Sequence, residues 1–79
     1  MFRTLIKTDS VVVENRTYRV RYFEQQTGRG ACRFSAEIVL GPDDRIILDG
    51  DSLTNLEART TRLVPATVYS RMLARVTAA

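Results

Sequence analysis

Two stretches of alternating apolar and polar residues constrain the fold of this chain more than any other feature. The first, residues 17–25 (TYRVRYFEQ), places three apolar side chains on one face: Tyr18, Val20 and Tyr22. The second, residues 31–40 (ACRFSAEIVL), gathers its apolar side chains on one face in the same way: Cys32, Phe34, Ala36, Ile38 and Leu40. A period of two residues is typical of a strand with one buried face, so the sequence predicts two neighbouring strands.

The segment between these strands predicts how they pair. Residues 25–30 (QQTGRG) contain two glycines, which accept the positive φ angles of a short hairpin loop. We therefore expect antiparallel pairing. Because the two apolar faces must coincide, the residue numbers of two paired residues must add up to an even number. A short loop around Gly28 leaves the sums 56 and 58, which place Glu37 opposite Arg19 or Arg21.

Weaker patterns extend the sheet on both sides. We expect a strand over residues 11–13, a turn over residues 14–16, and a further strand over residues 2–8 whose pairing the sequence leaves open. Downstream, Pro42 and the two aspartates that follow it favour a second turn. A short strand over residues 46–48 is expected after that turn.

The period changes after the last strand. Apolar or small residues now recur with the spacing of an amphipathic helix: Leu53, Leu56, Thr60, Leu63 and Val64. Ser52 stands in front of this helix as an N-cap, Asp51 lies where the helix dipole favours a negative charge, and Gly50 lets the chain turn out of the sheet.

The same corner has an alternative interpretation as a metal site. Four aspartates are available for it: Asp43, Asp44, Asp49 and Asp51. Their spacing differs from that of a calcium-binding loop, and such a site needs about six or more oxygen ligands. We therefore interpret the corner as structural and expect no metal ligand there.

Pro65 interrupts the helical pattern. Proline lacks the backbone donor and disfavours helical angles at Val64, so the chain either kinks or begins a second helix. We expect two helices, the second over residues 65–77 with Arg71 and Arg75 opposite its apolar face. That face is expected to comprise Val68, Tyr69, Met72, Leu73 and Val76.

These elements predict one α+β domain over residues 1–79. Its architecture is an antiparallel β-meander of three to four strands followed by one kinked or two C-terminal helices packed on one sheet face. A chain of 79 residues can build one core.

Composition argues against catalysis. The chain has no histidine, so the commonest general base is missing and Ser-His or Cys-His pairs cannot form. Its one cysteine, Cys32, is expected on an inner strand face, where it acts as a small apolar side chain. We expect no enzyme activity, no cofactor and no catalytic, cofactor-binding or metal-binding residue.

Composition also bears on the compartment. One cysteine excludes an internal disulfide, which fits a reducing environment. No apolar run has the length of a signal peptide or of a membrane span. We therefore expect a cytoplasmic protein with no membrane contact.

Charge is distributed in three blocks along the chain. Twelve basic and nine acidic residues give a formal net charge of +3, with basic residues concentrated over 16–33 and 59–75 and acidic residues over 37–57. One explanation is a nucleic-acid-binding surface, and the other is that the blocks pair within the fold or across a dimer. We favour the second, because acidic and basic blocks of similar size neutralise each other.

The strands followed by Gly50-Asp51-Ser52-Leu53 resemble the HicB-type antitoxin domain, in which a sheet leads through a Gly-Asp-Thr/Ser-Leu turn into a helix. The similarity covers roughly residues 18–60, and the family's proline-glycine stretch before this turn is not reproduced. The resemblance implies a small module that neutralises a partner toxin and often carries or joins a DNA-binding segment. A strand-to-helix corner favours the same four residues in unrelated folds, so antitoxin-like regulation stays an alternative.

We therefore expect a non-catalytic domain of unknown function that acts through protein–protein interaction, with itself as a homodimer or with another protein. The alternative is an arginine-based nucleic-acid-binding or antitoxin-like regulator. Surplus apolar residues on the outer sheet face and on the second helix favour an interface. The residues expected to form it are Arg19, Arg21, Phe23, Arg33, Val39, Tyr69 and Leu73.

Overall fold

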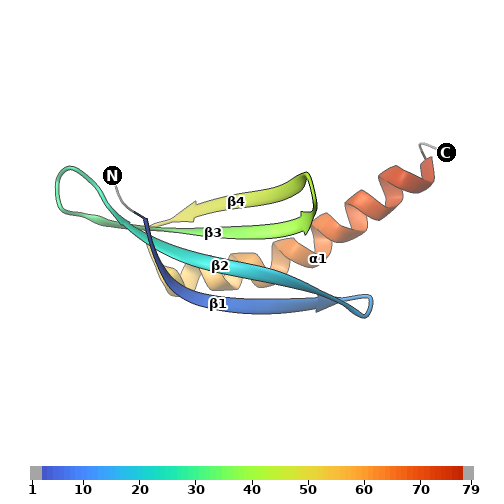
Figure 1. Cartoon of the computed structure of the whole chain (residues 1–79), viewed down its shortest axis with the longest axis horizontal. Coiled ribbons are helices and arrows are strands. Elements are labelled where there is room, and N and C mark those ends of the chain that lie inside the picture. The colour runs from blue at the N-terminus through green and yellow to red at the C-terminus, as the bar shows by residue number, and fades with distance from the viewer. Residues whose placement is uncertain (1–2, 78–79) are drawn as a thin grey trace.

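The computed structural model describes residues 3–77, with side chains from residue 3 to residue 75. In this part of the chain four strands come first: β1 (Arg3–Val13), β2 (Arg16–Gln26), β3 (Cys32–Gly41) and β4 (Asp44–Gly50). They form one antiparallel sheet in the order of the sequence, and the helix α1 (Leu53–Thr77) crosses one face of it (Figure 1). The predicted α+β fold with a β-meander and a C-terminal helical part is confirmed.

The pairing of β2 with β3 follows the predicted register. Arg21 lies opposite Glu37 and Val20 opposite Ile38, so the numbers of paired residues add up to 58. In the connecting loop only Gly30, among the described glycines, has a positive φ, at 81°. Its N–H donates to the Thr27 carbonyl at 3.0 Å. Both loop glycines were expected to adopt positive φ angles, and only Gly30 does so.

Strand β1 is longer than its sequence pattern predicts. The two expected pieces form one strand of 11 residues, which pairs with β2 and has a register irregularity between Leu5 and Lys7. Residues 1 and 2 lie outside the described part of the chain. Glu14 and Asn15, at φ values of 52° and 65°, form the two-residue turn into β2. Two successive positive φ values match the twist of a tight hairpin.

Strand β4 also exceeds its predicted length, because Asp49 and Gly50 continue the pairing with β3. Gly50 lies opposite Phe34 and is not among the described residues with positive φ. A Cβ atom at Gly50 would meet the Leu56 side chain at 3.7 Å, an ordinary contact distance. The corner therefore does not depend on the backbone freedom of glycine, contrary to our expectation, and the chain leaves the sheet after Gly50.

Ser52 caps the helix as predicted. Its hydroxyl oxygen accepts a hydrogen bond from the Asn55 N–H at 3.3 Å, and its carbonyl accepts one from the Leu56 N–H at 3.0 Å. The first bond satisfies one of the backbone donors that the first turn of a helix leaves without a partner, and the second is the first bond of the regular helical series.

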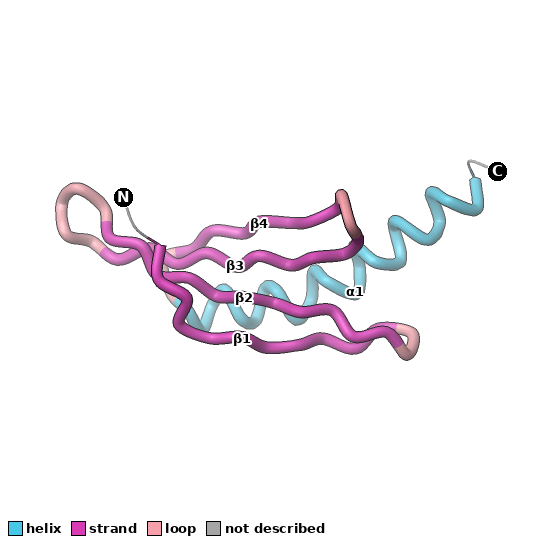
Figure 2. The backbone as a smooth tube through the Cα atoms, in the orientation of Figure 1, coloured by secondary structure: helices cyan, strands magenta, loops and turns pink. Residues whose placement is uncertain are grey.

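The expectation of two C-terminal helices is wrong, because α1 runs without interruption through Pro65 (Figure 2). Proline inside a helix costs about 3 kcal/mol. Val64 and Val68, on either side of Pro65, are both buried in the core. Because each buried valine contributes about 1.5–3 kcal/mol, keeping both packed against the sheet offsets the cost of the proline.

The core lies between the inner sheet face and α1. Strands and helix contribute these buried apolar side chains: Val13, Val20, Tyr22, Ala36, Ile38, Leu56, Val64 and Val68. Thr60 is also buried in this layer, where its hydroxyl donates to the Leu56 carbonyl at 2.8 Å.

Cys32 was expected inside this core and is instead exposed. It opens β3 opposite Gln26, beyond the Phe34–Gly50 pair at which β4 ends. Because α1 starts only at Leu53, after β4 has ended, the first residue of β3 has neither a third strand beside it nor the helix over it.

We predict that Ser52→Ala lowers the free energy of unfolding by about 1 kcal/mol, because the Asn55 N–H loses its acceptor. Urea denaturation followed by circular dichroism measures the change. Thr61→Ala is the matched control, since Thr61 is an exposed residue in the body of the same helix whose hydroxyl donates to the Glu57 carbonyl one turn earlier. An equal effect of both substitutions would contradict the capping role.

Candidate interaction surfaces

A buried glutamate lies in the middle of the outer sheet face, the face that α1 does not cover. The Glu37 side chain is 5% exposed, and its carboxylate accepts hydrogen bonds from Arg21 and, at 3.5 Å, from Arg45. The bond from Arg21 lowers the pKa of Glu37 below its ordinary value, the charges of both arginines add to this, and burial opposes it. The predicted cross-strand pair therefore forms, with Arg21 as the partner of Glu37.

Phe23, on the same face, lies beneath guanidinium groups. The Arg3 guanidinium carbon is 4.4 Å from the centre of the Phe23 ring, and that of Arg21 is 5.8 Å away. A cation at these distances is attracted to the ring face. Stacking of a nucleic-acid base on Phe23 would first have to displace these contacts.

The predicted interaction residues fall on two separate surfaces. The outer sheet face holds five of them: Arg19, Arg21, Phe23, Arg33 and Val39. The row formed by Arg21 and Glu37 lies between the row of Phe23 and that of Val39, so these apolar side chains do not form one patch. An antiparallel sheet commonly leaves such a mixed face to water.

The remaining two predicted residues, Tyr69 and Leu73, lie on the C-terminal half of α1. Figure 1 shows that this end of the helix extends beyond the turn between β3 and β4. Tyr69 is 46% and Leu73 66% exposed.

The helix presents its C-terminal residues differently from the prediction. Its buried residues, Leu56, Thr60, Val64 and Val68, follow each other at four-residue intervals. Each such step rotates the contact line by about 40° around the helix axis. Arg71 falls within the arc of the helix surface that these four residues cover. It therefore faces the sheet, contrary to our expectation, and its guanidinium donates to Asp44 at 2.8 and 3.3 Å. The side chain of Val76 lies outside the described residues.

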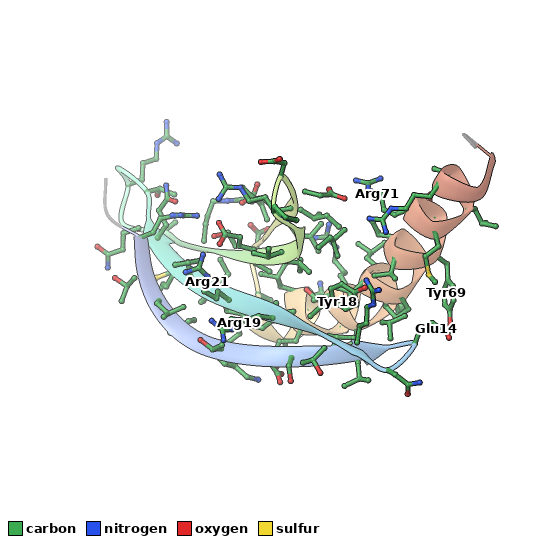
Figure 3. All side chains as sticks on the ribbon, turned by 45° about the vertical axis from the view of Figure 1, so that its right-hand side comes forward. Glu14, Tyr18, Arg19, Arg21, Tyr69 and Arg71 are labelled. Carbon is green, nitrogen blue, oxygen red and sulfur yellow. The ribbon has the colours of Figure 1, made fainter. Side chains whose placement is uncertain are left out.

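A groove opens between the end of the sheet and this half of α1. On one side the Tyr69 hydroxyl donates to the Glu14 carboxylate at 2.6 Å, and on the other Arg71 bonds to Asp44 (Figure 3). Its volume is about 350 Å³. The residues that line it are Glu14, Arg16, Tyr18, Leu40, Asp44, Val68, Arg71, Met72 and Arg75.

The charge blocks of the sequence meet within the chain. Besides Glu37, two carboxylates of the acidic block bind arginines of the basic blocks: Asp44 binds Arg71, and Asp51 binds Arg33 at 2.6 Å. Lys7 also donates to Glu57 at 2.6 Å and so joins β1 to α1. The acidic corner is therefore bound to neighbouring arginines through two of its four aspartates.

The described side chains offer little support for a nucleophile or a metal site. The Cys32 sulfur lies 3.5 Å from a Glu24 carboxylate oxygen, and this contact raises the pKa of the Cys32 thiol, which disfavours the thiolate. Within residues 3–75 the structure contains no group of three or more histidine, cysteine, aspartate or glutamate side chains arranged to hold a metal ion. In the part of the chain that the structure describes, no helix is both long and apolar enough to span a membrane.

Comparisons with protein-family models, with curated proteins and with solved structures find no match for this chain. The resemblance to the HicB-type antitoxin domain therefore gains no support from a family model.

Sequence reasoning missed the groove. Tyr18, Leu40 and Val68 belong to the core or pack against it, as expected, and they line the groove as well. Arg16, expected in a turn, lies at the start of β2. The common feature of these residues is position, because all of them lie toward one end of the sheet or the adjoining part of α1. Only the crossing of the helix over the strands brings them together, so no local pattern could have revealed it.

We predict that Glu37→Gln lowers the free energy of unfolding by about 1–3 kcal/mol near neutral pH, because two arginines lose a charged acceptor. Since the pKa of Glu37 is lowered by folding, its stabilising contribution is present above the unfolded pKa, about 4.3, and is lost as pH falls through the folded pKa. The difference from the parent chain should therefore shrink in urea titrations below about pH 4.

Glu24→Gln makes the same chemical change at a carboxylate that forms no ion pair among the described residues. We expect it to cost less than Glu37→Gln near neutral pH. If the loss of unfolding free energy in Glu37→Gln stays constant down to acid pH, the charged carboxylate does not have the proposed role.

We also predict no submicromolar binding of single-stranded or duplex oligonucleotides at physiological salt. Arg21, Arg33, Arg45 and Arg71 hold carboxylates. The other described arginines form no ion pair and lie on several elements, although two of them, Arg16 and Arg75, line one groove: Arg3, Arg16, Arg19, Arg29, Arg59, Arg62 and Arg75. Fluorescence anisotropy measures binding, and any weak association should fall steeply with salt. Submicromolar affinity would instead identify a nucleic-acid-binding domain.

Proposed function

We propose that this chain is a non-catalytic binding domain that acts in the cytoplasm through protein–protein contact, and that its partner is a second copy of itself. One observation carries the proposal: the end of α1 that extends past the sheet presents an exposed, uncharged face. We call this face the neutral stripe. It comprises Ala66, Tyr69, Ser70 and Leu73.

The spacing of the neutral stripe suits helix pairing. Its residues recur at i, i+3, i+4 and i+7, so they are neighbours on one side of the helix. In globular proteins such stripes pack into the grooves of a second helix at interaxial distances of about 8–10 Å. Tyr69 and Leu73 provide the two large side chains that such packing would bury.

Charge favours a second copy as the partner. Arg71 is held on the sheet side by Asp44, and Arg75 lines the groove, so neither lies on the neutral stripe. In a two-fold arrangement the same surface meets itself. The four residues of the stripe bring no like charges together in such a contact, and the Glu14 carboxylate beside Tyr69 is held by its hydroxyl.

The remaining chemistry supports a binding role. The chain lacks histidine, and three carboxylates, those of Glu37, Asp44 and Asp51, are bound by arginines, which favours structural over acid–base use. A single cysteine fits a reducing compartment.

We predict that sedimentation equilibrium at tens of micromolar reports about twice the chain mass of 9.0 kDa. Leu73→Glu should shift the protein to the monomer, because it replaces one of the two large apolar side chains of the neutral stripe with a charged one. Circular dichroism should show an unchanged fold, since Leu73 is exposed.

Val39→Glu is the control on the outer sheet face, the other predicted surface. Val39 is 42% exposed, and its substitution should leave the dimer intact. A monomeric parent chain at that concentration, or a dimer broken by Val39→Glu and kept by Leu73→Glu, would contradict the proposal. In the first case the neutral stripe would become a candidate surface for another protein.

A further inference from the structure

The groove between α1 and the end of the sheet adjoins the neutral stripe, with which it shares the Tyr69 side chain as a boundary. Its two side contacts fix its width, because Tyr69 is bonded to Glu14 at the turn between β1 and β2, and Arg71 to Asp44 beside the turn between β3 and β4. Figure 3 shows Arg71 on one side of this region, Glu14 and Tyr69 on the other, and Tyr18 on the sheet between them. The space is therefore defined by elements that are held in place.

The lining is apolar on two sides. Tyr18 and Leu40 come from the sheet, and Val68 and Met72 come from the helix. A volume of about 350 Å³ lies near the lower end of the range, about 300–1,000 Å³, for small-molecule sites. The groove thus offers room for a small apolar body.

The rim carries an excess of positive charge. It holds three arginines, Arg16, Arg71 and Arg75, against the carboxylates of Glu14 and Asp44. Asp44 is hydrogen-bonded to Arg71, while Arg16 and Arg75 form no ion pair among the described residues. Arg75 acts on Asp44 through its charge alone, without an ion pair, so the N–H donors of both guanidinium groups remain available to an anion. Arginine is well suited to carboxylates.

The geometry points to a binding site for a small amphipathic anion, namely an alkyl carboxylate whose chain lies on Tyr18, Leu40, Val68 and Met72 and whose head group meets Arg16 and Arg75. The apolar side chains favour an alkyl chain, and the excess of positive charge favours a negative head group over a neutral or positive one. All of these residues belong to one chain, so the site does not depend on dimerisation.

The test uses decanoate as the probe, below the concentration at which it forms micelles. In a heteronuclear NMR titration of the full chain we expect saturable shifts centred on Tyr18, Leu40, Val68 and Met72. Decanol and decyltrimethylammonium carry the same alkyl chain with a neutral and a positive head group. We expect both to bind at least about fivefold more weakly than decanoate, because one charge-assisted contact contributes about 1–3 kcal/mol.

Arg75→Gln should weaken decanoate binding about three- to tenfold, the range expected for one partly exposed charge contact. Arg62→Gln is the matched control, since Arg62 is an exposed arginine of the same helix that does not line the groove. Arg16→Gln combined with Arg75→Gln should bring the affinity for decanoate down to that for decanol.

Three results would overturn the inference: no saturable shift, shifts centred outside the groove, or equal binding of the three head groups. An equal loss of affinity in Arg62→Gln and Arg75→Gln would also overturn it, since the head group would then sense only net charge. Leu73→Gln removes an apolar side chain of the neutral stripe without adding charge. It should weaken the dimer and leave decanoate binding unchanged, so failure of one proposal is distinguishable from failure of the other.

Discussion

The burial of one stripe of α1 against the inner face of the sheet is the constraint on which the rest of the structure depends. Leu56, Val64 and Val68 follow one another along the helix at multiples of four residues and meet Val20 and Ile38 of the central strands. Because this packing spans Pro65, it keeps the helix continuous. A continuous helix of 25 residues is longer than the strands it crosses, so its C-terminal end extends past them.

The extension of the helix produces both surfaces that we consider functional. Where α1 leaves the core, Arg71 continues the side of the helix that faces the sheet and bonds to Asp44, while Tyr69 and Leu73, on other sides of the helix, stay exposed. The groove and the neutral stripe are therefore two sides of the same overhang. Polar contacts at the two hairpin turns, rather than apolar burial, hold the helix in this region.

The outer sheet face has a different character. Glu37 is buried there between Arg21 and Arg45, and Phe23 lies under Arg3 and Arg21. Its arginines thus serve the sheet itself, by compensating a buried carboxylate and covering an aromatic ring. A basic sequence block need not mark a nucleic-acid surface when its charges are neutralised across neighbouring strands.

Local sequence patterns determined the elements and much of their pairing. The alternation around Val20 and Ile38 predicted the two central strands and, with a short loop, the register that pairs Arg21 with Glu37; Ser52 marked the helix start. These features depend on residues close in sequence or directly across one hairpin. Only the tertiary structure decided that α1 continues through Pro65, that Cys32 is exposed, and that Arg16 and Arg75 line one groove. Each of these depends on where the helix crosses the sheet, and that crossing is set by packing between residues far apart in the chain.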